Sequence, residues 1–250
     1  MEVKILHLSD LHFGSPLHSE KLEANILSYT EKVKPDAIVI TGDLTEDGYP
    51  HEYEAAVKFI DKLKTELKLI VPGNHDARNM GYALFEEIFK NRYPTLEVGP
   101  IKIQGVDSSE PDLDDGRIGR LAYEIVKSSL KDYGGIRAVA LHHHLIPIPG
   151  TGRERNIPVD TGDFLHLLDE LDIHIVFSGH KHVPWIWVLN DIVILNAGTS
   201  TSLRVKARTP PSMNLVKIDS KGLVEVEKIC TLDLTSKPIY KAYLRGKHPS

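Results

Sequence analysis

The chain has 250 residues, 41% of them hydrophobic and 26% charged, a composition that predicts an ordinary soluble globular protein with a full core. The formal net charge of -5 argues against a protein whose main task is to coat nucleic acid. Cys230 is the only cysteine, so no disulfide can form within the chain, and no apolar run approaches the roughly 20 residues that a membrane helix needs. Because Glu2 and Lys4 interrupt any signal-peptide core, we expect a protein of the cytoplasm.

Strand and helix patterns alternate along the first 182 residues. Short β-rich or buried apolar runs predict strands within residues 3–10, 35–43, 67–76, 100–108, 136–144 and 173–182. Amphipathic spacing predicts helices at residues 19–32, 51–63, 81–92, 121–133 and 161–171. This alternation is typical of an α/β fold.

The last third of the chain changes to short alternating runs with turn residues between them. These runs, at residues 184–189, 191–198, 213–219 and 223–229, predict strands in a meander. No internal repeat or linker divides the chain, so we expect one domain over residues 1–235. Residues 236–250 are basic and contain Pro and Gly, and we expect a loosely held tail, or an arm that packs on a second subunit of a homodimer.

Polar residues with metal-binding side chains follow several of the predicted strands. They occur in the stretches "SDLH", "TGDL", "PGNHD", "ALHHH" and "SGHKH". In α/β sheets the crevice beyond the carboxyl ends of the strands is where ligands bind. Asp10 and His12 are two residues apart, as are His180 and His182, and in an extended chain that spacing places both side chains of a pair on one side.

The residue types at these strand ends suit a pair of divalent metal ions. Mixed carboxylate, amide and imidazole donors are typical of sites for Mn, Fe, Co, Ni or Zn. Seven such donors are too many for one ion, whereas two ions that share one carboxylate would use them all. Gly42, Gly73 and Gly179 come directly before polar residues and would allow tight turns and close packing around the ions.

The chain resembles the calcineurin-like metallophosphoesterases. Their motifs D-x-H, G-D, G-N-H-[DE], a histidine after a strand, and G-H-x-H occur here in the family order between residues 5 and 182, as Asp10-Leu11-His12, Gly42-Asp43, Gly73-Asn74-His75-Asp76, His142 and Gly179-His180-Lys181-His182. The resemblance implies a four-layer α-β-β-α sandwich of two mixed β-sheets flanked by helices. The "LSDLH", "GHKH" and "NAGTSTS" stretches are most similar to the branch that contains class III cyclic-nucleotide phosphodiesterases.

The resemblance also implies a role for each motif residue. Asp10, His12 and His182 would hold the first metal, Asn74, His142 and His180 the second, and Asp43 would bridge both. A hydroxide shared by the ions would attack the phosphate. His75 would stabilise the transition state or protonate the leaving group, and Asp76 would orient the ring of His75.

The histidine triplet His142-His143-His144 stands where family members often have H-H-P-P. Alignment on that pattern favours His142 as the metal ligand over His143. His143 would then face the substrate cavity or a neighbouring loop. His144 departs from the family, which usually has proline at that position.

Basic residues near the expected site are candidates for substrate binding. Arg153 and Arg155 lie in a long loop rich in Gly and Pro, and Arg204, Lys206 and Arg208 follow a later strand. They could bind a second part of the substrate, or pair with Glu154 and Asp160. A phosphodiester keeps a second organic group that such a loop could hold, so we expect a small-molecule phosphodiester, with a 3′,5′-cyclic nucleotide as the leading candidate from the resemblance.

Three other functions remain to be weighed against this one. A nuclease related to double-strand-break repair enzymes would carry further DNA-binding segments, so nucleic acid is not the favoured partner. A broad-specificity phosphomonoesterase would use the same metals. A non-enzymatic scaffold would have lost ligands or the catalytic histidine, and none is missing here.

Overall fold

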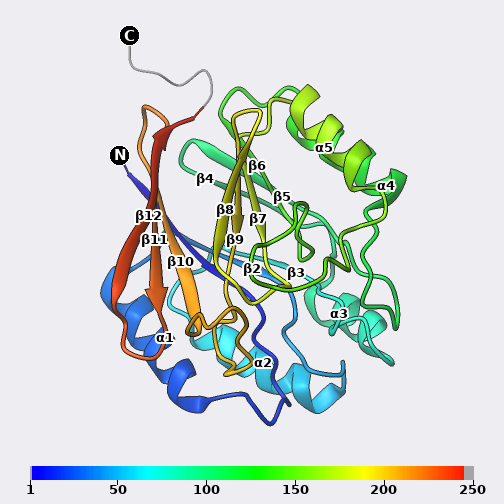
Figure 1. The fold of residues 1–250 in the computed structure, drawn as a ribbon, viewed down its shortest axis with the longest axis vertical. Helices are drawn as coiled ribbons and strands as arrows, with labels where there is room; N and C mark the ends of the chain where they lie inside the picture. Colours follow the sequence, from blue (N-terminus) through cyan, green and yellow to red (C-terminus); the bar gives the residue numbers. More distant parts are fainter. Residues whose placement is uncertain (1, 245–250) are drawn as a thin grey trace.

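The computed structural model describes residues 2–244, which form two six-stranded β-sheets stacked face to face with helices on both outer faces (Figure 1). The first sheet contains, in spatial order, β12 (Ser236–Tyr243), β11 (Leu223–Cys230), β10 (Ser212–Ile218), β1 (Val3–Leu8), β2 (Ala37–Thr41) and β3 (Lys68–Val71). The second contains β4 (Thr95–Val98), β5 (Ile101–Gly105), β6 (Ile136–Ala140), β7 (Ile175–Ser178), β9 (Ile192–Asn196) and β8 (Trp185–Leu189).

Both sheets are mixed. In the first, β1, β2 and β3 are parallel, and β10, β11 and β12 add antiparallel strands. In the second, β5, β6, β7 and β9 are parallel, with β4 and β8 antiparallel at the edges. The carboxyl ends of the parallel strands in each sheet therefore meet at one edge, which is where ligands bind in such folds.

Successive side chains of a strand point to opposite faces of its sheet, so each sheet has one face toward the other sheet and one face toward the helices. In β1, Val3 and Ile5 join the core between the two sheets, whereas Leu6 and Leu8 pack on the other face beneath helices. The helices are α1 (Glu20–Val33), α2 (Pro50–Lys62), α3 (Gly81–Phe89), α4 (Gly119–Leu130) and α5 (Thr161–Glu170). Helices α1, α2 and α3 pack on the first sheet, and α4 and α5 on the second. The α-β-β-α architecture expected from the resemblance is confirmed.

Two strands were not predicted from the sequence. One is β4, a short edge strand whose exposed and buried residues alternate. The other is β12, so the expectation of a loosely held tail is wrong for Ser236–Tyr243. Basic residues and Pro238 obscured the strand pattern. Pro238 lies on the edge strand at a register shift opposite Val226 and Glu227, which is where a sheet tolerates proline. Residues 245–250 of the expected tail lie outside the described residues.

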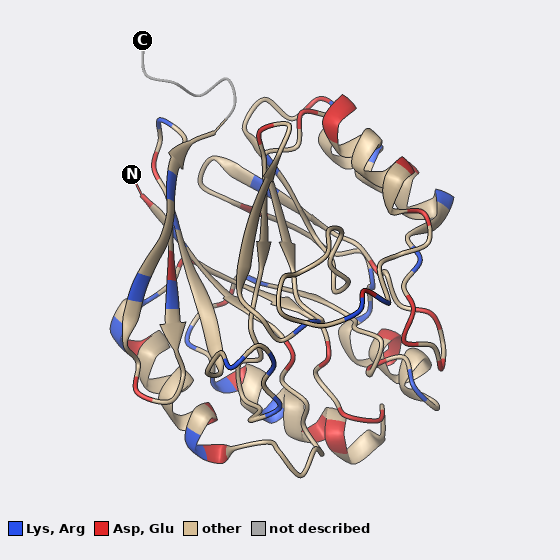
Figure 2. Ribbon diagram, in the orientation of Figure 1, with Lys and Arg blue, Asp and Glu red and all other residues tan. Residues whose placement is uncertain are grey.

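Within residues 2–244, no helix has both the length and the apolar character that crossing a bilayer requires. Figure 2 shows basic residues gathered in the loop between β9 and β10. That loop borders the site described next.

Candidate metal centre

All seven expected metal ligands meet at one edge of the sheets. Each lies in a loop that directly follows a strand, and each is buried or nearly so. The loops after β1, β2, β3, β6 and β7 supply, respectively, Asp10 and His12, Asp43, Asn74, His142, and His180 and His182.

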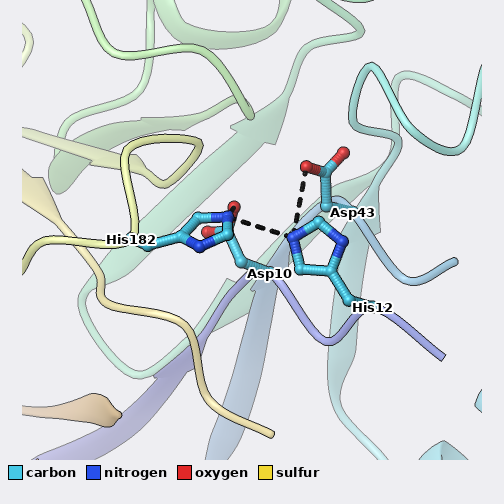
Figure 3. A group of neighbouring side chains, drawn as sticks. All are labelled: Asp10, His12, Asp43 and His182. Atoms are coloured by element: carbon cyan, nitrogen blue, oxygen red, sulfur yellow. Dashed lines mark hydrogen bonds and ion pairs between the residues drawn. The ribbon is translucent and has the colours of Figure 1, made fainter. Parts of the chain in front are cut away.

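The first group of donors consists of Asp10, His12, Asp43 and His182 (Figure 3). The Nε2 atoms of His12 and His182 are 3.0 Å apart, and Nε2 of His182 is 3.2 Å from Oδ1 of Asp10. Nε2 of His12 lies 3.8 Å from Oδ2 of Asp43. Four donor atoms from three separate loops therefore converge on one small volume.

The second group consists of Asp43, Asn74, His142 and His180. Nε2 of His142 is 3.0 Å from Oδ1 of Asn74, 3.1 Å from Nδ1 of His180 and 3.3 Å from Oδ2 of Asp43. The same Asn74 oxygen is 3.0 Å from Nδ1 of His180. These atoms again surround a single point.

Asp43 is common to both groups, and its two oxygens have different surroundings. Oδ1 accepts a hydrogen bond from the backbone N–H of His75 at 2.9 Å. Oδ2 faces His12 of one group and His142 of the other. This one oxygen therefore lies between the two donor groups.

The donor set fits a pair of divalent cations. Within residues 2–244, Oδ1 of Asp10 is buried and accepts no hydrogen bond. Closely facing ring nitrogens repel each other through their lone pairs unless a proton or a cation lies between them. Imidazole, carboxylate and amide donors suit borderline divalent ions.

The charges of the buried groups agree with this interpretation. Burial, together with His143 and His142, holds the pKa of His180 well below its usual range, and burial also lowers the pKa of His12, so both rings are neutral as coordination requires. His142 differs: burial opposes its charge, but the Asp43 carboxylate raises its pKa to about 9. The pKa of Asp43 is correspondingly held well below its usual range, despite burial, by His142 and His75. A bound cation would therefore displace a proton from His142.

The backbone at the ligands is not extended as the two-residue spacing suggested. Five of the seven ligand residues have positive φ angles, between 51° and 69°, and they are Asp10, His12, Asp43, His180 and His182. This left-handed conformation is uncommon for residues other than glycine and is typical of functional sites. The explanation from extended geometry was therefore wrong, although the paired side chains do converge.

Gly42 and Gly73 allow two ligand loops to touch. A Cβ atom on Gly73 would lie 2.2 Å from Oδ1 of Asp43, and one on Gly42 would lie 2.5 Å from the backbone nitrogen of Gly73. Neither position leaves room for a side chain. The expectation of close packing at these glycines is confirmed.

A run of small hydroxyl residues after β9 supports the loop that carries Asp10 and His12. Thr199 and Thr201 each donate a hydrogen bond of 2.6 Å, to the carbonyl oxygens of Asp10 and Leu11. The backbone N–H of Ser200 donates to the carbonyl of Ser9 at 3.0 Å. The sequence marked this run only as a family feature, and the structure shows its physical task.

The ring of His75 lies 4.7 Å from the ring of His12, beside the donor groups, but Asp76 does not orient it. Nδ1 of His75 lies 2.5 Å from the carbonyl oxygen of Glu46, and because a carbonyl only accepts, Nδ1 carries the proton. Asp76 instead accepts hydrogen bonds from the backbone N–H groups of Gly73, Leu44 and Thr45, which ties the loops after β2 and β3 together. The expected contact between Asp76 and the His75 ring is corrected accordingly.

In the histidine triplet, His142 is the residue whose ring nitrogen contacts other expected metal ligands, Asn74 and His180. His143 is buried against a neighbouring loop, with Nδ1 2.9 Å from Oγ of Ser108 and Nε2 3.2 Å from the carbonyl of Asp114. His144 stacks on His180 at a ring distance of 5.5 Å, and its Nε2 is 2.9 Å from Glu154. The ring of His144 therefore supports a ligand where proline would be expected.

A cavity of about 180 Å³ opens beside the two donor groups. Arg204 lines it, whereas His143, Arg153 and Arg155 are not among its lining residues. Glu154, one of the expected partners for the arginines, pairs instead with His144 and Lys181. Lys206, which was expected to lie near a strand end together with Arg204, also lines the cavity. The cavity further contains residues that were not singled out as site residues: Arg78, Asp114, Asn156 and Lys181.

Glu46 is a further residue that sequence reasoning missed. Its Oε2 lies 3.0 Å from Nδ1 of His12, and its Oε1 accepts from Arg204 at 2.9 Å. The only signal was its position three residues after Asp43, which would not have distinguished it from a solvated carboxylate.

Comparison with known proteins agrees with the fold. The calcineurin-like phosphoesterase family matches residues 3–184, and the chain belongs to this family. It is 26% identical over 235 residues to a probable cyclic nucleotide phosphodiesterase of Vesicomyosocius okutanii, covering 90% of this chain and 98% of the relative. It is 28% identical over 201 residues to the glycerophosphodiester phosphodiesterase GpdQ of Enterobacter lignolyticus, covering 71% and 70%.

Among solved structures, a purple acid phosphatase from yellow lupin seeds superposes with a TM-score of 0.73 at 14% identity, covering 97% of this chain and 53% of that one. That likeness concerns the fold alone. The family and the phosphodiesterase-named relatives identify the chain as a hydrolase of phosphate esters in the class III phosphodiesterase-like branch.

Proposed function

We propose that the protein is a dinuclear-metal phosphodiesterase that hydrolyses small-molecule phosphodiesters, with 3′,5′-cyclic nucleotides as the leading candidate substrates. The observation that carries the proposal is the pair of donor groups that share Oδ2 of Asp43. The relatives named as a cyclic nucleotide phosphodiesterase and a glycerophosphodiester phosphodiesterase support the choice of diesters.

The side chains divide the work between holding the ions and handling the substrate. Asp10, His12 and His182 would hold one ion, Asn74, His142 and His180 the other, and Asp43 both. When bound, the ions supply Lewis-acid charge that acidifies water and offsets negative charge on the phosphate. Manganese, iron, zinc, cobalt and nickel all suit these donors.

His75 would act on the substrate through Nε2. The carbonyl of Glu46 keeps the proton of the ring on Nδ1, so Nε2 is the atom that can take or give a second proton. The ring also lies edge-on to His12 at 4.7 Å, which restricts its rotation. A ring held in this way would donate a proton to the leaving alkoxide or stabilise charge on the phosphate.

A metal-resolved activity panel tests the proposal. Protein loaded separately with each of the five metals would be assayed on monoesters, linear diesters and cyclic nucleotides. We expect the highest kcat/KM for a diester, and no activity in the Asp43→Asn variant. Higher specificity for simple phosphomonoesters than for any diester would contradict the proposal and favour a broad-specificity phosphomonoesterase.

A further inference from the structure

The cavity beside the donor groups contains four basic side chains, and three of them have acidic partners. Arg78 lies 3.3 Å from Asp47 and 2.9 Å from Asp114. Lys181 is 3.1 Å from Glu154, and Arg204 is 2.9 Å from Glu46. The positive charge of these three residues is therefore already matched by protein carboxylates.

Lys206 is the exception. It lines the same cavity, and within residues 2–244 no carboxylate lies within ion-pair distance of its ammonium group. Burial lowers the pKa of Lys206, and Lys181 and Arg204 lower it further, although Asp10 partly offsets this. Lys206 is nevertheless exposed, and Lys181 and Arg204 add to the positive potential around it, so an anion that enters the cavity can pair with its ammonium group.

The segment that carries Lys206 is ordered by its own backbone. The carbonyl of Lys206 accepts hydrogen bonds from the N–H and the hydroxyl of Thr209, at 3.0 and 2.8 Å. Ala207 and Arg208 then take left-handed conformations, with φ of 51° and 54°. Two residues before Lys206, the carbonyl oxygen of Arg204 lies 2.5 Å from Nδ1 of the expected ligand His182, which places this segment beside the donor groups.

We propose that Lys206 binds a second anionic group of the substrate, so that the preferred substrate is a phosphodiester with a carboxylate or phosphate on one of its two organic groups. The inference rests on the proposed phosphodiesterase function and deepens it, because it favours diesters with a second anion over 3′,5′-cyclic nucleotides, whose scissile phosphate is their only anionic group. The scissile phosphate would be held at the donor groups, which leaves Lys206 free for the second anion. The volume of about 180 Å³ suits a small organic group between the two anions.

Two matched substrates test the inference. They are 4-nitrophenyl phenyl phosphate and 4-nitrophenyl 3-carboxyphenyl phosphate, and chromatography would follow hydrolysis of either ester bond. For wild-type protein loaded with manganese, we expect kcat/KM to be about tenfold higher for the carboxylated diester, the gain of one charge-assisted contact. This ratio should shrink at high salt because the lysine is exposed to the cavity.

Three variants separate the effect of Lys206 on the kcat/KM ratio from general effects of charge. Lys206→Ala should bring the ratio close to one, and Lys206→Arg should keep most of it. Arg208→Ala is the control: it removes a nearby cation that does not line the cavity and should leave the ratio unchanged. An equal rate for both diesters in the wild type, or an undiminished ratio in Lys206→Ala, would overturn the inference.

A binding measurement separates this inference from the proposed function. Dibenzylphosphinate and benzyl(3-carboxybenzyl)phosphinate resemble the two diesters but have methylene groups in place of both ester oxygens, so neither organic group can be lost and calorimetry gives their affinities without turnover. We expect the carboxylated phosphinate to bind the wild type about tenfold more tightly, and both phosphinates to bind Lys206→Ala with similar affinity. Equal affinities in the wild type, or no binding of either, would overturn the role of Lys206. If neither diester were hydrolysed, the proposed function would fail, and calorimetry would still decide whether Lys206 binds an anion.

Discussion

At the scale of single residues, the metal centre gives neighbouring histidines different surroundings. Nε2 of His142 faces Asp43, Asn74 and His180, whereas both ring nitrogens of His143 contact groups outside the donor sets. The two residues have the same chemistry and adjacent positions. Substituting each in turn is therefore a controlled test of position alone.

We expect His142→Ala to lose affinity for one metal and nearly all turnover, because three donors would remain at that ion. His143→Ala should bind two ions normally, with a milder kinetic defect that follows from the loss of its contact with Ser108. Metal content by mass spectrometry and kcat on one diester measure both effects, and the exposed His166→Ala is the control. Reversed results for His142 and His143 would show that the assignment of this loop is wrong.

His75 is expected to act in chemistry and not in metal binding. His75→Ala should retain both ions and lose about 10²–10³ in kcat. If Nε2 protonates the leaving group, the loss should be smaller for a 4-nitrophenyl ester, because nitrophenolate departs without a proton. The same loss for good and poor leaving groups would instead indicate that His75 stabilises charge on the phosphate.

The sequence was informative about residues that belong to motifs and uninformative about residues that support them. Asp10, His12 and Asp43 could be selected because each follows a strand and belongs to a short, ordered pattern. Their positive φ angles could not be predicted, because Asp and His adopt that conformation only when tertiary contacts impose it. Glu46 and Lys206 have no motif, and their significance depends on which side chains lie near them in space.

At the scale of secondary-structure elements, β12 is part of the sheet. Leu244, directly after it, is 1% exposed and packs in the core between the two sheets. We expect Leu244→Ala to lower the free energy of unfolding by about 2–4 kcal/mol, as truncation of a buried leucine does. The exposed Lys237→Ala, on β12 itself, should change it by less than about 0.5 kcal/mol. Urea unfolding measures both, and no effect of Leu244→Ala would restore the expectation of a loosely held tail.

His7 in β1 makes the sheet sensitive to acid. Its ring is buried, lies 3.0 Å from the hydroxyl of Thr41 and packs edge-on against Phe177. Burial lowers the pKa of His7 to about 3, although Asp10 partly opposes this. Because the folded state excludes a proton that the unfolded chain binds below about pH 6.5, stability is complete above that pH and falls by about 1.4 kcal/mol per unit below it, down to about pH 3.

His7→Gln should remove the acid sensitivity that His7 contributes, while the glutamine amide keeps a hydrogen-bond donor near Thr41. Between pH 7.5 and pH 5.5, we expect the free energy of unfolding to fall by about 1.4 kcal/mol less in the variant than in the wild type, measured by urea unfolding at both pH values. An identical pH dependence in both proteins would show that the folded state accepts a proton on His7.

The strand pattern predicted most of the elements, with helix ends displaced by a few residues. The helix expected over residues 81–92 ends at Phe89 because Lys90 adopts a left-handed conformation, with φ of 65°. Strand β4 was missed because its four residues alternate polar and apolar, whereas β3, also an edge strand of four residues, has three consecutive apolar residues. The grouping of strands into two sheets came from the family resemblance and not from periodicity.

At the scale of the whole molecule, the two sheets contribute to both donor groups. Asp10, His12, Asp43 and Asn74 follow strands of the first sheet, and His142, His180 and His182 follow strands of the second. Ions bound between them would therefore join the two halves of the sandwich. A ligand that binds only the folded state stabilises it, by about 2.7 kcal/mol at a concentration one hundred times its dissociation constant.

Removal of the ions should consequently lower the melting temperature. We expect chelated protein to unfold several degrees below metal-loaded protein, and added manganese to restore the higher value. Calorimetric melting of both forms measures the difference. Manganese should raise the melting temperature of the Asp43→Asn variant by less than that of the wild type, because both donor groups lose their shared carboxylate.

The number of ions in each chain tests the central claim most directly. Mass spectrometry of purified wild-type protein, after dialysis against a divalent metal and removal of the excess, should give close to two ions per chain. Asp43→Asn should give fewer and have no phosphodiesterase activity. A single ion in the wild type, or full activity after thorough chelation, would contradict the account of two ions that share Asp43.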